Sequence, residues 1–403
     1  MTRAPLQSLD QALDLLLADV HSAVEQESVE LNKALGRVLA ADLHARLDVP
    51  PWDNSAMDGY AARSTEAGQS LPVAQRIAAG ERPEPLPGAA VARIFTGAPL
   101  PPGADAVVMQ EDVQIDVEGR VILPAKIAPN DHVRHRGQDC RAGDHLLGAG
   151  RRLQPQDLGL IASQGISEVA VWRRLTVALL STGSELREPG SGELDAAAIY
   201  NSNRPMLAAL LEQLGCEVRD LGIVGDTPQA TRKALQAGAS ADLVISSGGV
   251  SVGEADHVRD VVAELGEIDL WRIAIKPGKP FAKGRVGSTP FLGLPGNPSS
   301  AFVTFVLLAR PFVHALQGRR DTGAVALPAR ADFAVPRPGS RREFLRVTTR
   351  VEGGELWATP YVNQSSGVLT SVSASDALAM VPEHRTLAHG DAIEILPLHR
   401  LMD

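Results

Sequence analysis

The chain has 403 residues, and 39 Lys and Arg against 48 Asp and Glu give it a formal net charge of −9. Its 44% hydrophobic and 22% charged residues exclude global disorder, and the length predicts roughly two to four domains. The acidic balance, without a long run of Lys or Arg, argues against nucleic acid as the main partner, because duplex binding depends on cationic contacts to phosphates.

The first predicted element is an amphipathic helix close to the N-terminus. Ser8 and Gln11 fit a capping box, and leucines at positions 9, 13, 16 and 17 fall on one helical face. Asp10 and Asp14 interrupt the apolar run that a secretory signal peptide would need. Since no later stretch approaches about 18 consecutive apolar residues, we expect no membrane-spanning segment.

The cysteine content indicates the redox environment. The two cysteines, Cys140 and Cys216, are far apart and lie outside any CxxC pattern. They support neither a disulfide framework nor a thiolate zinc site. We therefore expect a protein of the reducing cytoplasm.

Residues 53–139 predict a β-rich domain, because short alternating apolar runs are separated there by Pro and Gly clusters. We assign residues 26–43 to the same inserted domain. The flanking segments carry the chain into and out of it. Residues 1–25, 44–52 and 140–174 are therefore expected to form an elongated connecting domain.

Residues 175–325 alternate strand-length apolar runs with helical patterns, which predicts an α/β domain with a mostly parallel sheet. The expected strands are 176–180, 217–224, 242–246, 271–275 and 291–294, and the expected helices are 205–214 and 228–237. Thr227 and Asn297 are expected N-caps. Residues 326–403 predict a small β domain of barrel-like character. The predicted fold class is thus α/β and β multidomain.

Ligands of parallel sheets bind beyond the carboxyl ends of the strands, so the loops after the five expected strands form the candidate site. These loops carry the following candidate residues: Ser181, Thr182, Gly183, Glu185, Asp226, Ser247, Gly248, Gly249, Ser251, Asp256, Lys276, Lys279, Pro295, Gly296, Asn297 and Pro298. Glycine-rich backbone and helix N-termini suit a phosphate, and the two lysines would add point charges. The three carboxylates would repel that phosphate unless a divalent cation lies between them, and hard oxygen ligands favour Mg²⁺.

Each loop taken alone has a plainer explanation. Glycines at strand ends usually make turns, Asp226 and Asn297 fit helix caps, and KPGKP from Lys276 fits a solvated turn. SSGGVSVG from Ser246 is neither a GxGxxG fingerprint nor a P-loop, so a dinucleotide dehydrogenase or a P-loop NTPase is not indicated. The convergence of all five loops at one edge is what favours a binding site.

Polar groups outside this domain form weaker candidates. Asp58 lies in PPWDNSAMDGY, Thr96 lies in a loop rich in Pro and Gly, and Arg134, Arg136 and Arg141 form a local basic cluster. A turn, a stiff loop and a solvated linker would account for them without any function.

At these residues the chain resembles the molybdopterin molybdenumtransferase family, the MoeA proteins, which are related to the E domain of gephyrin. The resemblance covers nearly the full chain. The matching stretches are PPWDNSAMDGYA from Pro50, RIFTGAPLPPGADAVVMQED from Arg93, RHRGQD from Arg134, STGSEL from Ser181, YNSN from Tyr200, SSGGVSVGEADH from Ser246, KPGKP from Lys276, LPGNPSSAFVTF from Leu294 and RREFLR from Arg341.

This resemblance implies an enzyme that inserts molybdate into adenylylated molybdopterin and releases AMP with the help of Mg²⁺. It also implies a homodimer whose cleft lies between the α/β domain of one subunit and the inserted β domain of the other. Matched by motif, the implied functional positions are Asp58, Thr96, Arg136, Asp139, Glu185, Asp226, Asp256, Lys276, Lys279, Pro295 and Pro298. Ser184 stands where the commoner family motif has Asp, which puts a metal role for that position in doubt.

The alternatives come from related proteins. Molybdopterin adenylyltransferases resemble the α/β domain alone and carry a GGTG-type loop, whereas this chain has GGVS from Gly248 and additional domains. A separate adenylyltransferase is expected to supply the substrate, and molybdoenzymes or cofactor-maturation proteins are further candidate partners. A gephyrin-like scaffold and an enzyme that inserts tungstate remain the rival functions.

Overall fold

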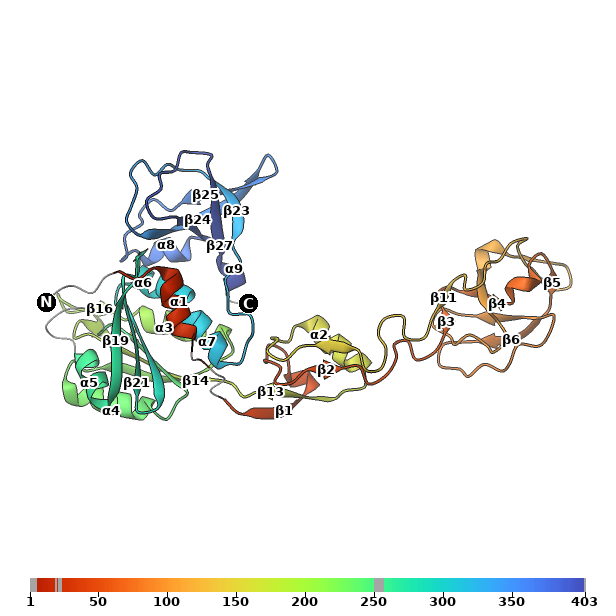
Figure 1. Cartoon of the computed structure of the whole chain (residues 1–403), viewed down its shortest axis with the longest axis horizontal. Helices are drawn as coiled ribbons and strands as arrows, with labels where there is room; N and C mark the ends of the chain where they lie inside the picture. The colour runs from red at the N-terminus through yellow and green to blue at the C-terminus, as the bar shows by residue number, and fades with distance from the viewer. Residues whose placement is uncertain (1–5, 19, 21–23, 250–256, 402–403) are drawn as a thin grey trace.

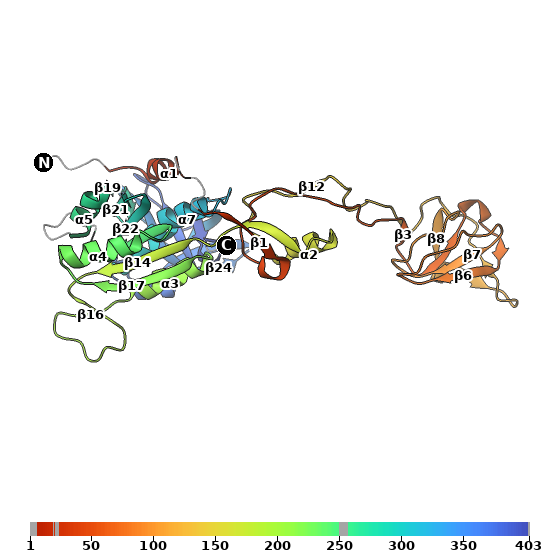
Figure 2. The same ribbon diagram turned by 90° about the horizontal axis from the view of Figure 1, so that it is seen from below.

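The computed structural model describes residues 6–18, 20, 24–249 and 257–401. Figures 1 and 2 show an elongated chain, with a β-rich domain at one end and the α/β and C-terminal domains together at the other. A narrow connecting region joins the two ends. The predicted α/β and β multidomain architecture is confirmed.

The α/β domain is built on a six-stranded sheet of order β17-β14-β18-β22-β21-β19. Its strands are β14 (Thr176–Thr182), β17 (Glu217–Val224), β18 (Leu243–Ser247), β19 (Gly266–Arg272), β21 (Pro280–Val286) and β22 (Thr289–Leu294). The pairs of β14 with β17 and β18, and of β18 with β22, are parallel, whereas β21 and β19 run antiparallel. Four strands therefore end at the same edge of the sheet.

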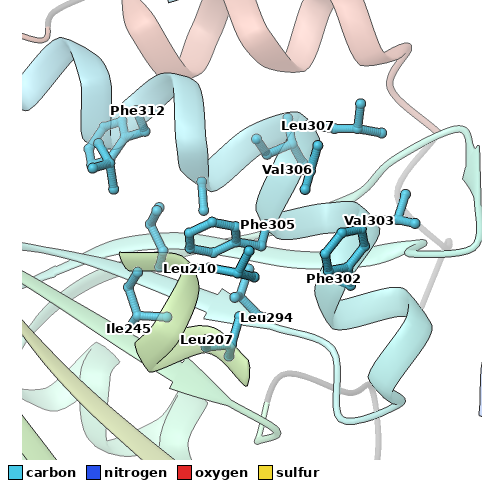
Figure 3. Close-up of a cluster of buried hydrophobic side chains, with 14 of the residues drawn as sticks. Leu207, Leu210, Ile245, Leu294, Phe302, Val303, Phe305, Val306, Leu307 and Phe312 are labelled. Atoms are coloured by element: carbon cyan, nitrogen blue, oxygen red, sulfur yellow. The ribbon is translucent and has the colours of Figure 1, made fainter. Parts of the chain in front are cut away.

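Helices cover both faces of this sheet. Leu179 packs into one core and its neighbours Ala178 and Leu180 into another, as expected for a strand buried on two sides. One face is covered by α4 (Pro228–Gly238) and α5 (His257–Leu265), and the other by α3 (Asn203–Gln213), α6 (Pro298–Thr304) and α7 (Arg310–Leu316). Figure 3 shows Phe305 packed with Leu210 of α3 and Leu294 of β22 on the second face.

A π-helical turn, η4 (Phe305–Ala309), joins α6 and α7 into one helix of 19 residues, Pro298–Leu316. By length and composition alone this helix could cross a membrane. However, 94% of its most apolar stretch is buried inside the protein, so core packing accounts for its apolarity.

The expected fourth parallel strand at 271–275 is wrong. Residues 266–272 form β19, which pairs antiparallel with β21, and β20 (Ile275–Lys276) instead pairs with β24 of the C-terminal domain. A short alternating apolar run fits a strand of either direction, and only the tertiary partners decide it.

Two segments pack with other domains than expected. Helix α1 (Leu9–Leu17) has the predicted Ser8–Gln11 capping box, but its buried Leu9 and Leu16 belong to the α/β core and not to the connecting domain. Residues 26–43 belong with the connecting domain and not with the β-rich domain. Their strand β1 (Gln26–Glu30) pairs with β13 (Glu168–Trp172), because apolar side chains of 29–43 meet those of 146–171 in one core.

The described part of the connecting domain also contains a 3₁₀ turn, η1 (Leu31–Lys33), and further regular elements. They are β2 (Leu43–His44), β12 (His145–Leu147) and α2 (Pro155–Ser163), and β2 pairs with β12. Here the chain leaves for the β-rich domain and returns from it as two adjacent segments (Figure 1).

The β-rich domain contains a four-stranded sheet of order β6-β7-β4-β8 and smaller pairings. Its strands are β3 (Asn54–Ser55), β4 (Gly59–Ala62), β5 (Ser70–Leu71), β6 (Val73–Ile77), β7 (Val91–Ile94), β8 (Ala106–Met109), β9 (Gln114–Ile115), β10 (Val121–Ile122) and β11 (Val133–Arg134).

The C-terminal domain is a closed barrel of five strands, because β24 pairs with both β25 and β26 while β23 and β27 complete the ring. The strands are β23 (Leu327–Ala331), β24 (Arg342–Glu352), β25 (Glu355–Pro360), β26 (Ala377–Val381) and β27 (Ala392–Pro397), with helices α8 (Leu369–Ser373) and α9 (Leu398–Leu401). The barrel-like prediction for the tail is confirmed.

Candidate functional site

A cavity of about 1030 Å³ opens beyond the carboxyl ends of β14, β17, β18 and β22. Eleven predicted site residues line it: Thr182, Gly183, Glu185, Asp226, Ser247, Gly248, Gly249, Pro295, Gly296, Asn297 and Pro298. Ser181 lies just beneath, 1% exposed, and its hydroxyl has no hydrogen-bond partner in the described chain. Ser251 and Asp256 lie outside the described residues.

Backbone geometry explains the glycines after β18. Gly248 and Gly249 have φ of 89° and 71°, a region that favours glycine. A Cβ on Gly249 would lie 2.8 Å from Val258 Cβ and 2.9 Å from Thr182 Oγ1, and one on Gly248 would lie 2.8 Å from the Thr182 carbonyl oxygen. The loop therefore packs as bare backbone against β14. The Gly248 N–H already donates to the Leu294 carbonyl at 3.0 Å, so the N–H of Gly249 is the group of this pair that an anion could approach.

Asn203, at the start of α3, joins two of these loops. Its side-chain amide, 8% exposed, donates to Ser247 Oγ at 2.9 Å and to the Gly296 carbonyl at 2.7 Å. Neither Asn203 nor its neighbour Asn201 was a predicted site residue, although both line the cavity and stand in the YNSN motif that supported the resemblance.

Two buried polar atoms of the cavity lining have no hydrogen-bond partner in the described chain. Asn203 Oδ1 and Asn201 Nδ2 find no hydrogen-bond partner among the residues that the structure describes. Because buried polar groups are nearly always satisfied, this acceptor and this donor can take hydrogen bonds from an ordered water or from a polar ligand in the cavity.

The long helix Pro298–Leu316 begins at this cavity. Asn297 occupies the N-cap position, as predicted, but its side chain makes no capping hydrogen bond. Asn297, Pro298 and Ser300 line the cavity. Pro298 has no N–H and the Ser299 N–H donates to the Ser366 carbonyl at 3.0 Å, so the positive end of the helix dipole, more than free N–H groups, would favour a negatively charged ligand here.

The charged groups in the described lining are Glu185 and Asp226, both exposed carboxylates. The Glu185 carboxylate sits so close to Gly183 that a Cβ there would lie 2.7 Å from Oε2. Neither carboxylate forms an ion pair with any part of the chain that the structure describes, and those residues contain no group of three His, Cys, Asp or Glu placed to hold a metal ion.

The two predicted lysines flank the cavity and do not line it. Lys276 Nζ lies 2.8 Å from Glu343 of the C-terminal barrel, which offsets its charge. The Lys279 carbonyl accepts a hydrogen bond from Ile273 N at 2.8 Å, and the next residue, Pro280, does line the cavity. The loop reaches this edge because β21 starts here and runs antiparallel to β22, and not because a parallel strand ends here.

The C-terminal barrel adds a wall that the sequence did not predict. Gly367 and Leu369 line the cavity, and Ser299 Oγ donates to the Val368 carbonyl at 2.8 Å. Arg346, 1% exposed, holds this loop through Ser371 Oγ at 3.1 Å and the Ser365 carbonyl at 3.4 Å. Burial lowers the pKa of Arg346 from its usual value.

The remaining predicted residues belong to the β-rich domain or to the segment that leaves it, and Figure 2 shows that domain, with β3, β6, β7 and β8, at the opposite end of the molecule from the α/β sheet. Asp58 Oδ1 accepts hydrogen bonds from Thr96 N and Thr96 Oγ1, each at 2.8 Å, so the structure brings these two residues together. The backbone N–H of Thr96, followed by its hydroxyl, holds the pKa of Asp58 below its usual value.

Arg136 and Asp139 lie on the segment that leaves the β-rich domain. Arg136 Nε donates to Asp48 at 2.5 Å, and its backbone N–H donates to Asp53 at 2.7 Å. Asp139 N donates to the Val49 carbonyl at 2.9 Å. In one chain the predicted residues therefore fall into two groups, one on the α/β domain and one on the distal part of the chain.

Comparison with protein families matches three regions in order. Residues 7–165 match the MoeA N-terminal region (domain I and II), residues 178–315 match a probable molybdopterin binding domain, and residues 328–398 match the MoeA C-terminal region (domain IV).

Curated relatives and solved structures match over the whole chain. The molybdopterin molybdenumtransferase of Haemophilus influenzae is 39% identical over 98% of this chain and 99% of its own, and that of a Nostoc species is 36% identical over 95% and 91%. A molybdopterin biosynthesis MoeA protein from Pyrococcus horikosii superimposes with a TM-score of 0.80 at 33% identity, covering 98% of this chain and 99% of the other.

Proposed function

The chain belongs to the molybdopterin molybdenumtransferase family, a family of transferases in molybdenum cofactor biosynthesis, and we propose that it inserts molybdate into adenylylated molybdopterin and releases AMP. The observation that carries this proposal is the cavity itself. Glycine-rich loops, the start of a long buried helix and two carboxylates without an ion-pair partner among the described residues meet at one edge of a parallel sheet. Such an edge suits a phosphoanhydride together with a second anion.

The negative charges that would meet at this edge of the sheet require a cation between them. Molybdate is a dianion, and placing it beside a phosphoanhydride costs several kcal/mol at short range unless positive charge lies between them. Glu185 and Asp226 line the cavity without a cationic partner in the described chain, and carboxylate oxygens beside phosphate suit Mg²⁺. When bound, Mg²⁺ would offset this charge and polarise the phosphoanhydride as a Lewis acid.

The protein groups then have distinct roles. Glu185 and Asp226 would hold the cation, while the backbone of Gly249 and the amide of Asn201 would bind and orient the substrate. The cavity's described lining offers no nucleophile paired with a base, so the proposed transfer needs no covalent enzyme intermediate.

We further propose that the active unit is a homodimer with a cleft shared between subunits. Asp58 and Thr96 form a fixed polar pair on the β-rich domain, remote from the cavity of their own chain (Figure 1). The long connecting region would let this domain reach the cavity of a second copy. A two-fold axis would then generate two equivalent sites.

The cellular context follows from the same reaction. A separate molybdopterin adenylyltransferase would supply the substrate, and molybdoenzymes or cofactor-maturation proteins would receive the product. The free thiols of Cys140 and Cys216, both buried, support a location in the reducing cytoplasm.

The direct test mixes the purified protein with adenylylated molybdopterin, molybdate and Mg²⁺ and follows AMP. We expect release that depends on both molybdate and Mg²⁺, that is lost in Asp226→Asn and that is retained in Glu217→Gln, a matched carboxylate at the opposite end of β17. Absence of AMP above background at every molybdate concentration would overturn the proposal.

Two further readouts separate the rival functions. Metal analysis of the product after competition between molybdate and tungstate decides which oxyanion is inserted, because both have the same charge and shape. Stoichiometric capture of a protein partner without AMP release would instead favour a scaffold.

A further inference from the structure

Four side chains form a cation–aromatic row on the sheet of the β-rich domain: Tyr60, Arg76, Arg93 and Phe95. Tyr60 of β4 lies opposite Arg93 of β7, and Arg93 lies opposite Arg76 of β6. The guanidinium carbons of Arg76 and Arg93 lie 4.7 and 4.8 Å from the centroid of the Phe95 ring, and that of Arg93 lies 5.1 Å from the Tyr60 ring centroid.

The row is continuous with the Asp58–Thr96 pair. Phe95 directly precedes Thr96, and Arg93 donates to the carbonyl of Gly59, the residue after Asp58, at 2.9 Å. Arg93 also donates to Gln110 Oε1 at 2.5 Å. These bonds hold the Arg93 guanidinium near Asp58, whose pKa its charge helps to lower, so the row and the pair are adjacent.

The side chain of Arg76 differs from that of Arg93 because its one polar or ring contact within the described chain is with the Phe95 ring. It is exposed and stacks on Phe95, and its guanidinium forms neither a hydrogen bond nor an ion pair with any residue that the structure describes. Arg93 likewise has no carboxylate in ion-pair contact within the described chain. The charge of Arg93 is partly offset by Asp58, whose pKa it helps to lower, whereas the exposed Arg76 guanidinium has no carboxylate in ion-pair contact among the described residues.

The cation–aromatic row would supply cationic side chains to the shared cleft, which the α/β cavity itself does not provide within its described lining. The described lining of the α/β cavity contains the carboxylates Glu185 and Asp226 but no Lys, Arg or His. Its substrate would carry several negative charges and two heteroaromatic rings. Guanidinium planes bind both features, because they pair with phosphate oxygens and stack on flat rings.

We propose that the cation–aromatic row is the substrate-recognition surface that the β-rich domain of one subunit adds to the cavity of the other. It binds the anionic heteroaromatic part of the substrate, a purine or pterin ring that carries a phosphate. This inference rests on the proposed function and deepens it, since it assigns ring recognition to the distal domain and metal handling to the α/β domain. Arg76 is the diagnostic residue.

The test compares Arg76→Gln and Arg76→Lys with Arg82→Gln, an exposed arginine of the same domain outside the row. We expect Arg76→Gln to raise the KM for adenylylated molybdopterin about tenfold while kcat stays within about twofold, as for loss of a cation–ring contact. Arg76→Lys should also raise KM, because an ammonium group keeps the charge but not the plane. Arg82→Gln should behave as the unmodified protein.

Competition by AMP separates the two rings. If Arg76→Gln weakens inhibition by AMP in parallel with KM, the row binds the purine; if only KM rises, it binds the pterin. An unchanged KM in both Arg76 variants, with AMP release intact, would overturn this inference and leave the proposed function standing.

The role of the row can also be tested if the proposed function itself proves wrong. If the unmodified protein releases no AMP, the proposed function fails, and equilibrium binding of adenylylated molybdopterin to the full chain tests the row by itself. Weaker binding by Arg76→Gln than by Arg82→Gln would support the row, and equal binding would overturn it.

Discussion

Replacing Asn203 with alanine tests whether the two central loops of the cavity are held together by one buried amide. Asn203 Nδ2 is 2.9 Å from Ser247 Oγ on β18 and 2.7 Å from the Gly296 carbonyl after β22. The variant removes both hydrogen bonds at once. It leaves Ser247, only 3% exposed, without this donor.

The cost follows from the two bonds. Each intramolecular hydrogen bond contributes a net ~1 kcal/mol, and a buried acceptor left unsatisfied costs a further ~1–3 kcal/mol. Local opening of the two loops should therefore become easier by about 3–5 kcal/mol, which corresponds to roughly 150- to 5,000-fold faster amide exchange.

Hydrogen exchange on peptides covering residues 243–249 and 291–297 measures this change directly. Asn32→Ala is the control, because Asn32 is exposed, and its effect should stay within about 0.5 kcal/mol. Exchange in Asn203→Ala that is indistinguishable from this control would refute the idea that the amide clamps the cavity.

Three further predictions concern single positions. Gly249→Ala should cost at least about 1 kcal/mol and reduce AMP release, because φ is 71° and the new Cβ would lie 2.8 Å from Val258 Cβ; unfolding and turnover measurements check both effects. Gly318→Ala should loosen the connecting domain from the α/β domain, since its Cβ would lie 2.5 Å from Trp172 Nε1, and tryptophan fluorescence should report the displacement. The hydroxyl of Thr359, followed by Arg350, lowers the pKa of Asp332 to about 2, so its stabilising contribution is complete above the unfolded-state pKa of about 3.9 and is lost as pH falls through about 2. Unfolding of the C-terminal barrel should therefore depend less on pH between about 4 and 2 in Asp332→Asn than in the unmodified protein, and equal slopes would contradict this assignment.

The sequence predicted local structure where one signal dominates. Strand β17 has its predicted bounds, and Thr227 accepts the expected capping bond from Ala230 N at 3.2 Å. Period-2 alternation and cap chemistry are local properties, so a single chain reveals them.

Local sequence signals could not predict which strands pair when they are far apart in the chain. The partner of β1 is strand β13, about 140 residues later, and nothing within 26–43 identifies it. The direction of β19 depends in the same way on β21. Such choices are made by side chains that meet only in the folded protein.

The same difference between local signals and long-range contacts applies to the candidate site. Gly248, Asp226 and Pro298 were found because strand ends of a parallel sheet meet at one edge. Asn203 was missed because a buried amide at a helix start resembles an ordinary cap in sequence. The pairing of Lys276 with Glu343 was also missed, because it joins two domains.

The measurement that bears most directly on the shared cleft is the activity of a mixed dimer. One chain carries Asp58→Asn and the other Glu185→Gln, each with its own affinity tag, so that only mixed dimers are purified. Either homodimer should be inactive, whereas the mixed dimer has one unaltered site and should release AMP at about half the rate of the unmodified dimer. A mixed dimer no more active than its two parent homodimers would show that Asp58 and Glu185 do not act across a subunit interface.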